Sequence, residues 1–276
     1  IQLNKTDYLA ASLINGNIHL WDLNTQKIKF NLIAHKSSIW SLIELSSGLV
    51  VSGSSDKTIK LWDIRNMNEN SLTTFKGHKG TIFCLAELDN KRLISGSEDR
   101  TIRVWDLLKF HCVMTLYDPN KAKINCLIPL KKDSNFFLTG NDDNLIKIWN
   151  LSKGKVDNYL KAHDCTVWCL VSFADDELLA SGSSDNVIKI WDLETLKLLY
   201  SLEGHENTIS GIKVLSEELL ASASWDSMIK IWNLNTRNCI YNLEGHSDIV
   251  WDIIELKDGN IATCSNDSQI IIWERK

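Results

Sequence analysis

Proline is scarce in this chain, and long apolar stretches do not occur in it. Two prolines among 276 residues leave little to interrupt the backbone hydrogen bonds of a β-sheet. The sequence contains no apolar run of the roughly 18 residues that a membrane-spanning helix needs. The sequence therefore predicts no membrane helix and favours a chain built of strands.

Long runs of charge of one sign do not occur in the sequence. The formal net charge is −5 and the sequence pI is about 5.8. Proteins that bind nucleic acids or membrane surfaces in a general way usually carry a basic excess. The composition thus argues against both roles, and it leaves other proteins as the expected partners.

Paired cysteines are also missing. The chain has seven cysteines, an odd number, and no Cys-x-x-Cys motif. A disulfide scaffold or a structural zinc site needs cysteines in pairs. We therefore expect free thiols in an intracellular compartment, cytoplasmic or nuclear, with no metal and no cofactor.

A unit of about 42 residues repeats along the whole chain. It ends each time on tryptophan followed by an acidic residue or asparagine, and successive tryptophans are 41, 43, 44, 42, 41 and 41 residues apart. The seven are Trp21, Trp62, Trp105, Trp149, Trp191, Trp232 and Trp273. Residues 58–62, which precede the second of them, alternate polar and apolar side chains as a half-buried strand does. A repeat of this length with this ending is typical of four-stranded propeller blades.

In these features the chain resembles the WD-repeat family from end to end. The resemblance implies an all-β fold, a seven-bladed β-propeller of four-stranded antiparallel blades, formed as one domain over residues 1–276. Each blade would run from an inner strand a to an outer strand d. The chain supplies strand d only six times, so the closing blade lacks one outer strand. We expect the chain to be part of a longer protein in which residues before Ile1 supply that strand.

The family pattern also implies a hydrogen-bonded tetrad in each blade: histidine before strand a, serine or threonine on strand b, aspartate in the b–c turn and tryptophan on strand c. Five blades match it, with His35, Ser52, Asp56, Trp62; His78, Ser95, Asp99, Trp105; His163, Ser181, Asp185, Trp191; His205, Ser222, Asp226, Trp232; and His246, Thr263, Asp267, Trp273. Blade 4 has no such histidine, and blade 1 has Ala11 and Asn15 in place of the hydroxyl residue and the aspartate. The networks of blades 1 and 4 are therefore predicted to be incomplete.

Aspartate, histidine and serine also form catalytic triads, so an enzyme must be weighed. A set that recurs five times, always with tryptophan, fits a structural network, because an enzyme needs one distinctive site. The sequence has no phosphate-binding loop, no metal-spaced cluster and no unmatched acid–base pair. We expect no enzymatic activity and no catalytic residue.

Four tryptophans lie outside the repeat. Trp40, Trp168 and Trp251 each follow a motif histidine by five residues, and Trp225 lies in a b–c turn. In the family, both locations open onto the top face around the central channel, where partner peptides dock. Packing between blades is the alternative for any single ring. The candidate partner-binding residues are Trp40, Phe83, Asn125, Trp168, Trp225, Trp251, Glu98, Asp142 and Asp252.

Charge on the predicted top face differs between the two halves of the chain. Blades 2–4 carry Lys36, Lys57, Lys79, Arg100, Lys121 and Lys123, mixed with Glu98, Asp118 and Asp142. Blades 5–7 carry Asp164, Glu206, Asp248 and Asp252 without lysine. Our hypothesis is a protein-interaction module, either a scaffold or the substrate-recognition domain of a larger complex. It would bind a partner segment whose basic side chain enters among Trp168, Trp225 and Trp251. Nucleic-acid binding by the basic half is the alternative.

Overall fold

The computed structural model describes residues 1–4, 6–66 and 69–275 of the chain. These residues divide into two compact units, Ile1–Pro129 and Leu130–Lys276, and each is treated by itself below. The expectation of one domain over residues 1–276 remains a prediction. None of the described residues belongs to a helix long and apolar enough to cross a membrane.

The described residues of unit 1 form twelve strands and one short 3-10 helix. They are β1 (Tyr8–Ser12), β2 (Asn17–Asp22), β3 (Lys27–Ile33), β4 (Ile39–Glu44), β5 (Val50–Ser54), β6 (Thr58–Trp62), η1 (Ile64–Asn66), β7 (Thr73–Lys76), β8 (Ile82–Asp89), β9 (Arg92–Ser97), β10 (Thr101–Asp106), β11 (His111–Tyr117) and β12 (Ile124–Pro129).

Unit 2 consists of fourteen strands. They are β13 (Phe136–Asn141), β14 (Leu145–Asn150), β15 (Lys155–Lys161), β16 (Val167–Phe173), β17 (Leu178–Ser183), β18 (Ile188–Asp192), β19 (Lys197–Leu202), β20 (Ile209–Val214), β21 (Leu219–Ser224), β22 (Ile229–Asn233), β23 (Asn238–Leu243), β24 (Val250–Glu255), β25 (Ile261–Ser265) and β26 (Ile270–Trp273).

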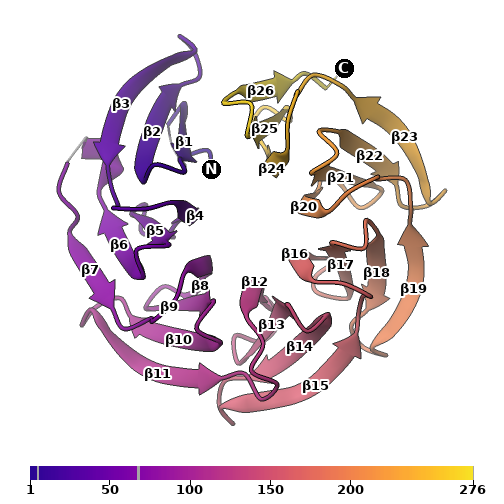
Figure 1. Cartoon of the computed structure of the whole chain (residues 1–276), viewed down its shortest axis with the longest axis horizontal. Helices are drawn as coiled ribbons and strands as arrows, with labels where there is room; N and C mark the ends of the chain where they lie inside the picture. Colours follow the sequence, from indigo (N-terminus) through magenta and orange to yellow (C-terminus); the bar gives the residue numbers. More distant parts are fainter. Residues whose placement is uncertain (5, 67–68, 276) are drawn as a thin grey trace. The chain divides into compact units, whose positions relative to one another are not determined.

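The strands pair in chain order into seven antiparallel sheets, which we call blades 1 to 7. Blades 2, 3, 5 and 6 have four strands each, for example β16-β17-β18-β19 in blade 5. Blade 7 has three, β24-β25-β26, as predicted for a blade without its outer strand. Blade 1 has β1-β2-β3, and the chain start pairs with β1 through a bridge between Gln2 and Leu9. Figure 1 shows that within unit 1 the first strands β4 and β8 lie on the concave side and the last strands β7 and β11 on the convex side.

Because the strands are antiparallel, two kinds of loop gather at one end of every four-stranded sheet. This end holds the loop before the first strand and the turn between the second and third strands, and we call it the upper end. The first strand of blade 5, β16, begins at the upper end, and the β17–β18 turn returns to it. The other turns lie at the lower end.

Apolar side chains fill the space between neighbouring blades of each unit. Between blades 2 and 3 the buried residues include Val51, Ile59, Leu61, Phe75, Ile82, Leu85, Leu93 and Trp105. Between blades 5 and 6 they include Ala180, Ile188, Ile190, Leu202, Ile209, Leu220 and Trp232. Burying these rings and branched chains supplies the main stabilising free energy of each pair of sheets.

Two glycines let neighbouring blades approach closely. A Cβ atom on Gly96 of blade 3 would lie 2.5 Å from the Cγ2 atom of Ile124 on β12, and one on Gly182 of blade 5 would lie 2.6 Å from the Cγ2 atom of Ile209 in blade 6. The same Cβ atoms would lie 2.6 and 2.7 Å from the Sγ atoms of Cys84 and Cys169, which pair with these glycines within their own blades. No real Cβ contact is that short, so any larger residue would push the blades apart. Burial also raises the pKa of the Cys84 thiol well above its usual range. These cysteines therefore serve packing.

A carboxylate at the lower end of one blade holds the backbone of the blade before it. The side chain of Glu44 accepts a hydrogen bond from the backbone N–H of Asn4 at 2.6 Å. Glu87 accepts two, from the N–H and the hydroxyl of Ser46, each at 2.7 Å. These charge-assisted bonds tie neighbouring sheets together where no strand pairing can do so.

The structure brings together all five predicted tetrads. In blade 6, His205 Nδ1 lies 2.7 Å from Asp226 Oδ2, and His205 Nε2 lies 2.7 Å from the Ser222 hydroxyl, which accepts the indole N–H of Trp232 at 2.8 Å. The same three contacts measure 2.7–2.9 Å in blades 2, 3, 5 and 7. Each network links the loop before the first strand to the second strand, the following turn and the third strand.

Protonation within the tetrads follows from burial and hydrogen bonding. Burial lowers the pKa of His35 and His78 below 6.5, although Asp56 and Asp99 oppose this. Burial alone would raise the pKa of Asp226, but hydrogen bonds from His205 and from backbone amides outweigh it and lower the pKa to about 2. Near pH 7, His35 and His78 are thus neutral: Nδ1–H donates to aspartate and Nε2 accepts from serine.

Blade 4 satisfies its polar groups in a different way. Thr139 accepts the indole N–H of Trp149 at 2.9 Å, as in the other blades. In place of a histidine, Asn141 Oδ1 accepts the Thr139 hydroxyl at 2.9 Å. Lys147 is fully buried, and its ammonium group lies 2.7 Å from the Asp143 carboxylate. The sequence analysis foresaw neither contact. In blade 1, Asn15 makes a local turn bond to the N–H of Asn17 at 3.0 Å.

We predict that His205→Ala lowers the free energy of unfolding by about 2 kcal/mol or more, because Ser222 and Asp226 lose a buried hydrogen-bond partner. Urea unfolding followed by circular dichroism measures the change. His111→Ala is the matched control, since His111 is exposed on β11 and belongs to no tetrad. Equal stability of the two variants would contradict a structural role for the tetrad.

Candidate functional site

A β-bulge begins the first strand of five blades. The pairing register skips one residue there, and that residue is Trp40, Phe83, Trp168, Ser210 or Trp251. A bulge interrupts the alternation of side chains along a strand. The side chain of the bulged residue can therefore point in a direction that a regular strand does not allow. Four of these five side chains are aromatic, and all lie at the upper end of their blades.

In unit 1 the bulged aromatics form a pair. The rings of Trp40 and Phe83 meet edge to face, with centroids 5.5 Å apart. The Trp40 indole donates to the hydroxyl of Ser55 in the β5–β6 turn at 2.8 Å, and 40% of the residue is exposed. The equivalent Asn125 on β12 is buried, with 7% exposed, so this predicted partner-binding residue offers little surface.

In unit 2 three tryptophans form a continuous row across blades 5, 6 and 7. The ring centroids of Trp168 and Trp225 are 5.9 Å apart, and those of Trp225 and Trp251 are 5.7 Å apart. All three residues are half-buried. We call Trp168, Trp225 and Trp251 the tryptophan row.

The middle ring of the row, Trp225, lies in the turn between β21 and β22, whereas Trp168 and Trp251 lie in the bulges of β16 and β24. In blade 5 the bulged Trp168 donates to Ser184 of the following turn at 2.8 Å. In blade 6 the two residue types are exchanged: the bulged residue is Ser210, whose hydroxyl lies 2.5 Å from the Val250 carbonyl, and the turn residue is Trp225. The small Ser210 leaves space at the upper end of blade 6, and the indole of Trp225 lies between the rings of the adjacent blades.

This exchange leaves one donor without an acceptor. The Nε1–H group of Trp225 is buried and has no hydrogen-bond partner among the described residues. Burying such a donor costs about 1–3 kcal/mol. The ring contacts with Trp168 and Trp251 offset that cost and hold Trp225 in the row.

The tetrads fix the residues that carry charge at the upper ends. In each of the five blades the tetrad aspartate accepts the backbone N–H of the residue after the histidine, at 2.7–3.1 Å. That residue is Lys36, Lys79, Asp164, Glu206 or Ser247. The network thus holds cations at this position in unit 1 and carboxylates in blades 5 and 6 of unit 2.

Further carboxylates lie at the upper end of unit 2. Asp252 follows Trp251 and is exposed, with its carboxylate accepting the N–H of Ile253 at 2.8 Å. Asp248 accepts the side-chain amide of Asn266 at 2.8 Å. Asp142, in the β13–β14 turn, is exposed. In unit 1, Glu98 is ion-paired with Lys123 at 2.9 Å, and this contact lowers the pKa of Glu98.

The net charge of the sequence also differs between the two units. Residues 1–129 hold 16 Lys and Arg against 12 Asp and Glu, a net charge of +4. Residues 130–276 hold 14 against 23, a net charge of −9. Unit 2 therefore carries an excess of negative charge, which favours the approach of cations.

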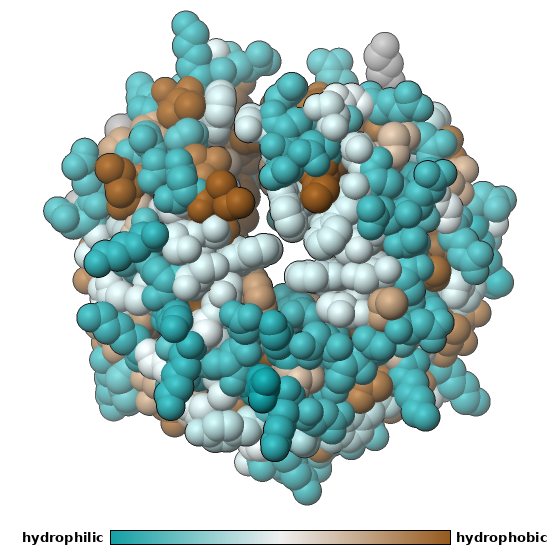
Figure 2. Space-filling view, viewed as in Figure 1, coloured by the Kyte–Doolittle hydropathy of each residue, from teal (hydrophilic) through white to brown (hydrophobic). Residues whose placement is uncertain are grey.

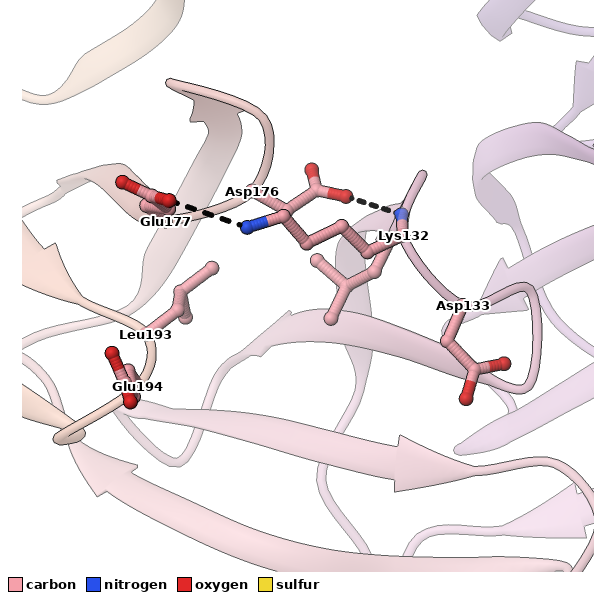
Figure 3. A pocket seen from close by; sticks show the side chains of 7 residues that line it. Lys132, Asp133, Asp176, Glu177, Leu193 and Glu194 are labelled. Carbon is pink, nitrogen blue, oxygen red and sulfur yellow. Dashed lines mark hydrogen bonds and ion pairs between the residues drawn. The ribbon is translucent and has the colours of Figure 1, made fainter.

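A hollow of about 430 Å³ lies at the lower end of unit 2, away from the tryptophan row. It is lined by Leu130, Lys132, Asp133, Asp176, Glu177, Leu193 and Glu194. Figure 3 shows that the Lys132 side chain reaches Glu177 while its backbone N–H donates to Asp176. Asp176 also accepts hydrogen bonds from the N–H of Lys131 and the hydroxyl of Ser172. Its carboxylate is therefore fully engaged in holding two turns together.

Tetrad serines cannot act as nucleophiles in this arrangement. Ser52, Ser95, Ser181 and Ser222 are 0% exposed, and each hydroxyl already contacts a histidine and a tryptophan. A substrate cannot reach a fully enclosed hydroxyl group. Among the described residues, no group of three or more His, Cys, Asp or Glu is placed to hold a metal ion.

Comparison with known proteins agrees with this architecture. The WD40 β-propeller domain of Doa1, known from a crystal structure, superposes on 98% of this chain and 90% of its own with a TM-score of 0.87 and 25% sequence identity. The fold class is therefore the predicted one: an all-β, seven-bladed propeller of four-stranded antiparallel blades whose last blade has three strands.

The family described as "WD domain, G-beta repeat" matches residues 26–63, 69–106, 110–150, 154–192, 196–233 and 237–274. The chain belongs to this WD40 family. Propellers of the family bind other proteins, and the fold is generally a non-catalytic interaction scaffold.

Individual relatives match only short segments. "WD repeat and SOCS box-containing protein 1" of Mus musculus is 40% identical over 60 residues, which cover 21% of this chain and 14% of the relative. "Cell division control protein 4" of Saccharomyces cerevisiae is 30% identical over 61 residues, which cover 22% and 8%. The matched part thus spans less than a fifth of the length of either relative.

We predict that Trp225→Phe leaves the free energy of unfolding unchanged or raises it by up to about 1 kcal/mol, because it removes a buried unpaired donor. Trp168→Phe makes the same change of ring but removes the hydrogen bond to Ser184, so it should lower the free energy of unfolding by about 1 kcal/mol. Urea unfolding of both variants measures the difference. A larger loss in Trp225→Phe than in Trp168→Phe would contradict the assigned environments.

Proposed function

We propose that this propeller is a protein-interaction module that binds a partner segment through the tryptophan row, with a lysine or arginine of that segment held against the rings. The observation that carries the proposal is the row itself: three indole rings in contact, half-buried, at the upper end of a unit with a net charge of −9.

The chemistry of the row suits a cationic side chain. Tryptophan offers the strongest cation–π attraction of the aromatic residues, and Asp164, Glu206 and Asp252 are exposed on the same upper end. A guanidinium or ammonium group near these rings would meet both the negative ring faces and the carboxylates. Charged groups set the orientation and rate of binding, while the aromatic anchors supply most of the affinity.

The surface favours recognition by a few anchors over broad apolar contact. Figure 2 shows a face that is mostly hydrophilic or intermediate in hydropathy, with hydrophobic side chains in small separate groups. Interfaces with such surfaces concentrate binding energy in aromatic and arginine residues. Seven free cysteines fit a reducing, intracellular setting for this module.

The proposal predicts that Trp168→Ala combined with Trp251→Ala weakens partner binding at least tenfold, as expected for the loss of two aromatic anchors. A partner segment is first obtained by affinity capture and peptide mapping, and its dissociation constant is then measured by calorimetry. Replacing the basic residues of that segment by glutamine should weaken binding to a similar extent.

Tyr241→Ala is the matched control, because it removes an aromatic ring that is 63% exposed on the outer strand β23 of the same unit and lies outside the tryptophan row. Circular dichroism should show all variants folded. Unchanged affinity in the double variant, or equal loss in Tyr241→Ala, would refute the assignment to the row.

A further inference from the structure

Four cations occupy equivalent positions in blades 2 and 3. Lys36 and Lys79 follow the tetrad histidines, and their backbone N–H groups donate to Asp56 and Asp99 at 3.1 and 2.7 Å. Lys57 and Arg100 follow those same aspartates. Each blade therefore carries one cation on either side of its tetrad aspartate. We call Lys36, Lys57, Lys79 and Arg100 the basic rim.

The backbone of the basic rim is fixed. Lys57 and Arg100 have φ angles of 70° and 69°, the left-handed conformation that closes the turn between the second and third strands. This conformation is uncommon for residues with a side chain and persists only where the surrounding bonds determine it. The rim cations thus project from two rigid turns.

The side chains of the basic rim are available to a ligand. All four residues are exposed, and none makes an ion pair among the described residues. Two other cations of unit 1 are engaged: Lys60 donates to the Ala34 carbonyl at 2.6 Å, and Lys123 pairs with Glu98.

The aspartates beside the rim do not hydrogen-bond to it through its side chains. The Oδ2 atom of Asp99 accepts hydrogen bonds from His78 Nδ1 and from the N–H of Lys79. Its Oδ1 atom accepts hydrogen bonds from the hydroxyl and the N–H of Thr101. Asp56 has the same set of partners. The ammonium and guanidinium donors of the rim therefore remain open to a different acceptor.

An apolar surface adjoins the rim. The indole of Trp40 bonds to Ser55, two residues before Lys57, and packs edge to face on Phe83. An apolar side chain next to an acidic residue of a partner would pack on this half-exposed ring, while the acidic residue contacts the cations.

We infer that the basic rim binds an acidic segment of a partner protein, with Asp and Glu carboxylates held by the four cations and an apolar side chain packed on Trp40. This goes beyond the function proposed above, because none of these residues belongs to the tryptophan row. A protein segment suits the rim better than a nucleic acid does. Glu98 lies in the β9–β10 turn, and the whole chain carries a net charge of −5. Both repel a continuous phosphate backbone, with one charge per nucleotide, more strongly than a short segment with a few spaced carboxylates.

The test uses the whole chain and a fluorescein-labelled peptide of Asp and Glu residues around a central leucine, titrated by fluorescence anisotropy at low ionic strength. The rim variant replaces Lys36, Lys57, Lys79 and Arg100 by glutamine. The control variant replaces Lys27, Lys29, Lys91 and Lys109 by glutamine, which are exposed lysines elsewhere in unit 1, so both lose four positive charges.

We expect the rim variant to bind the peptide at least tenfold more weakly and the control variant to change by less than about twofold, since contacts at the rim outweigh the long-range field. An Asn and Gln version of the peptide should not bind. Three results would overturn the inference: no binding to the unmodified chain, equal loss in both variants, or a single-stranded RNA of equal length binding at the rim more tightly than the peptide.

Discussion

The buried contact between histidine and its serine or threonine is the interaction on which the rest of this structure depends. In blades 2, 3, 5, 6 and 7 the histidine joins the incoming loop at the upper end to the interior of the sheet. The linked aspartate then accepts the backbone N–H of the next residue. A structural network inside the blade thereby sets the position of a surface side chain, and the identity of that side chain is free to vary.

That separation of roles explains how similar blades can present different chemistry. Lysine, aspartate, glutamate and serine all occur after the histidine, because only their backbone enters the network. The bulge at the start of the first strand acts in the same way for the aromatic residues. The scaffold is uniform, while the upper ends differ in charge and in ring content.

The sequence predicts the strands, the five tetrads and the location of the extra aromatics, because each depends on local periodicity or on spacing within one repeat. Two features were not predictable from such patterns. Lys147 looks like any polar residue of an alternating strand, and nothing in that alternation indicates that it is buried in an ion pair with Asp143. The position of Trp225 depends on Ser210, fifteen residues earlier, and on rings from two other blades. Its unpaired N–H follows from that three-dimensional arrangement and leaves no trace in the sequence.

Hydrogen exchange of the indole N–H groups, followed by NMR, tests the central role of the tetrads most directly. The N–H groups of Trp62, Trp105, Trp191 and Trp232 should exchange only through global unfolding, with a protection free energy equal to that from urea unfolding. The N–H of Trp168, bonded to a serine in a surface turn, should exchange much faster. Exchange of the tetrad indoles at the rate of Trp168 would contradict the account.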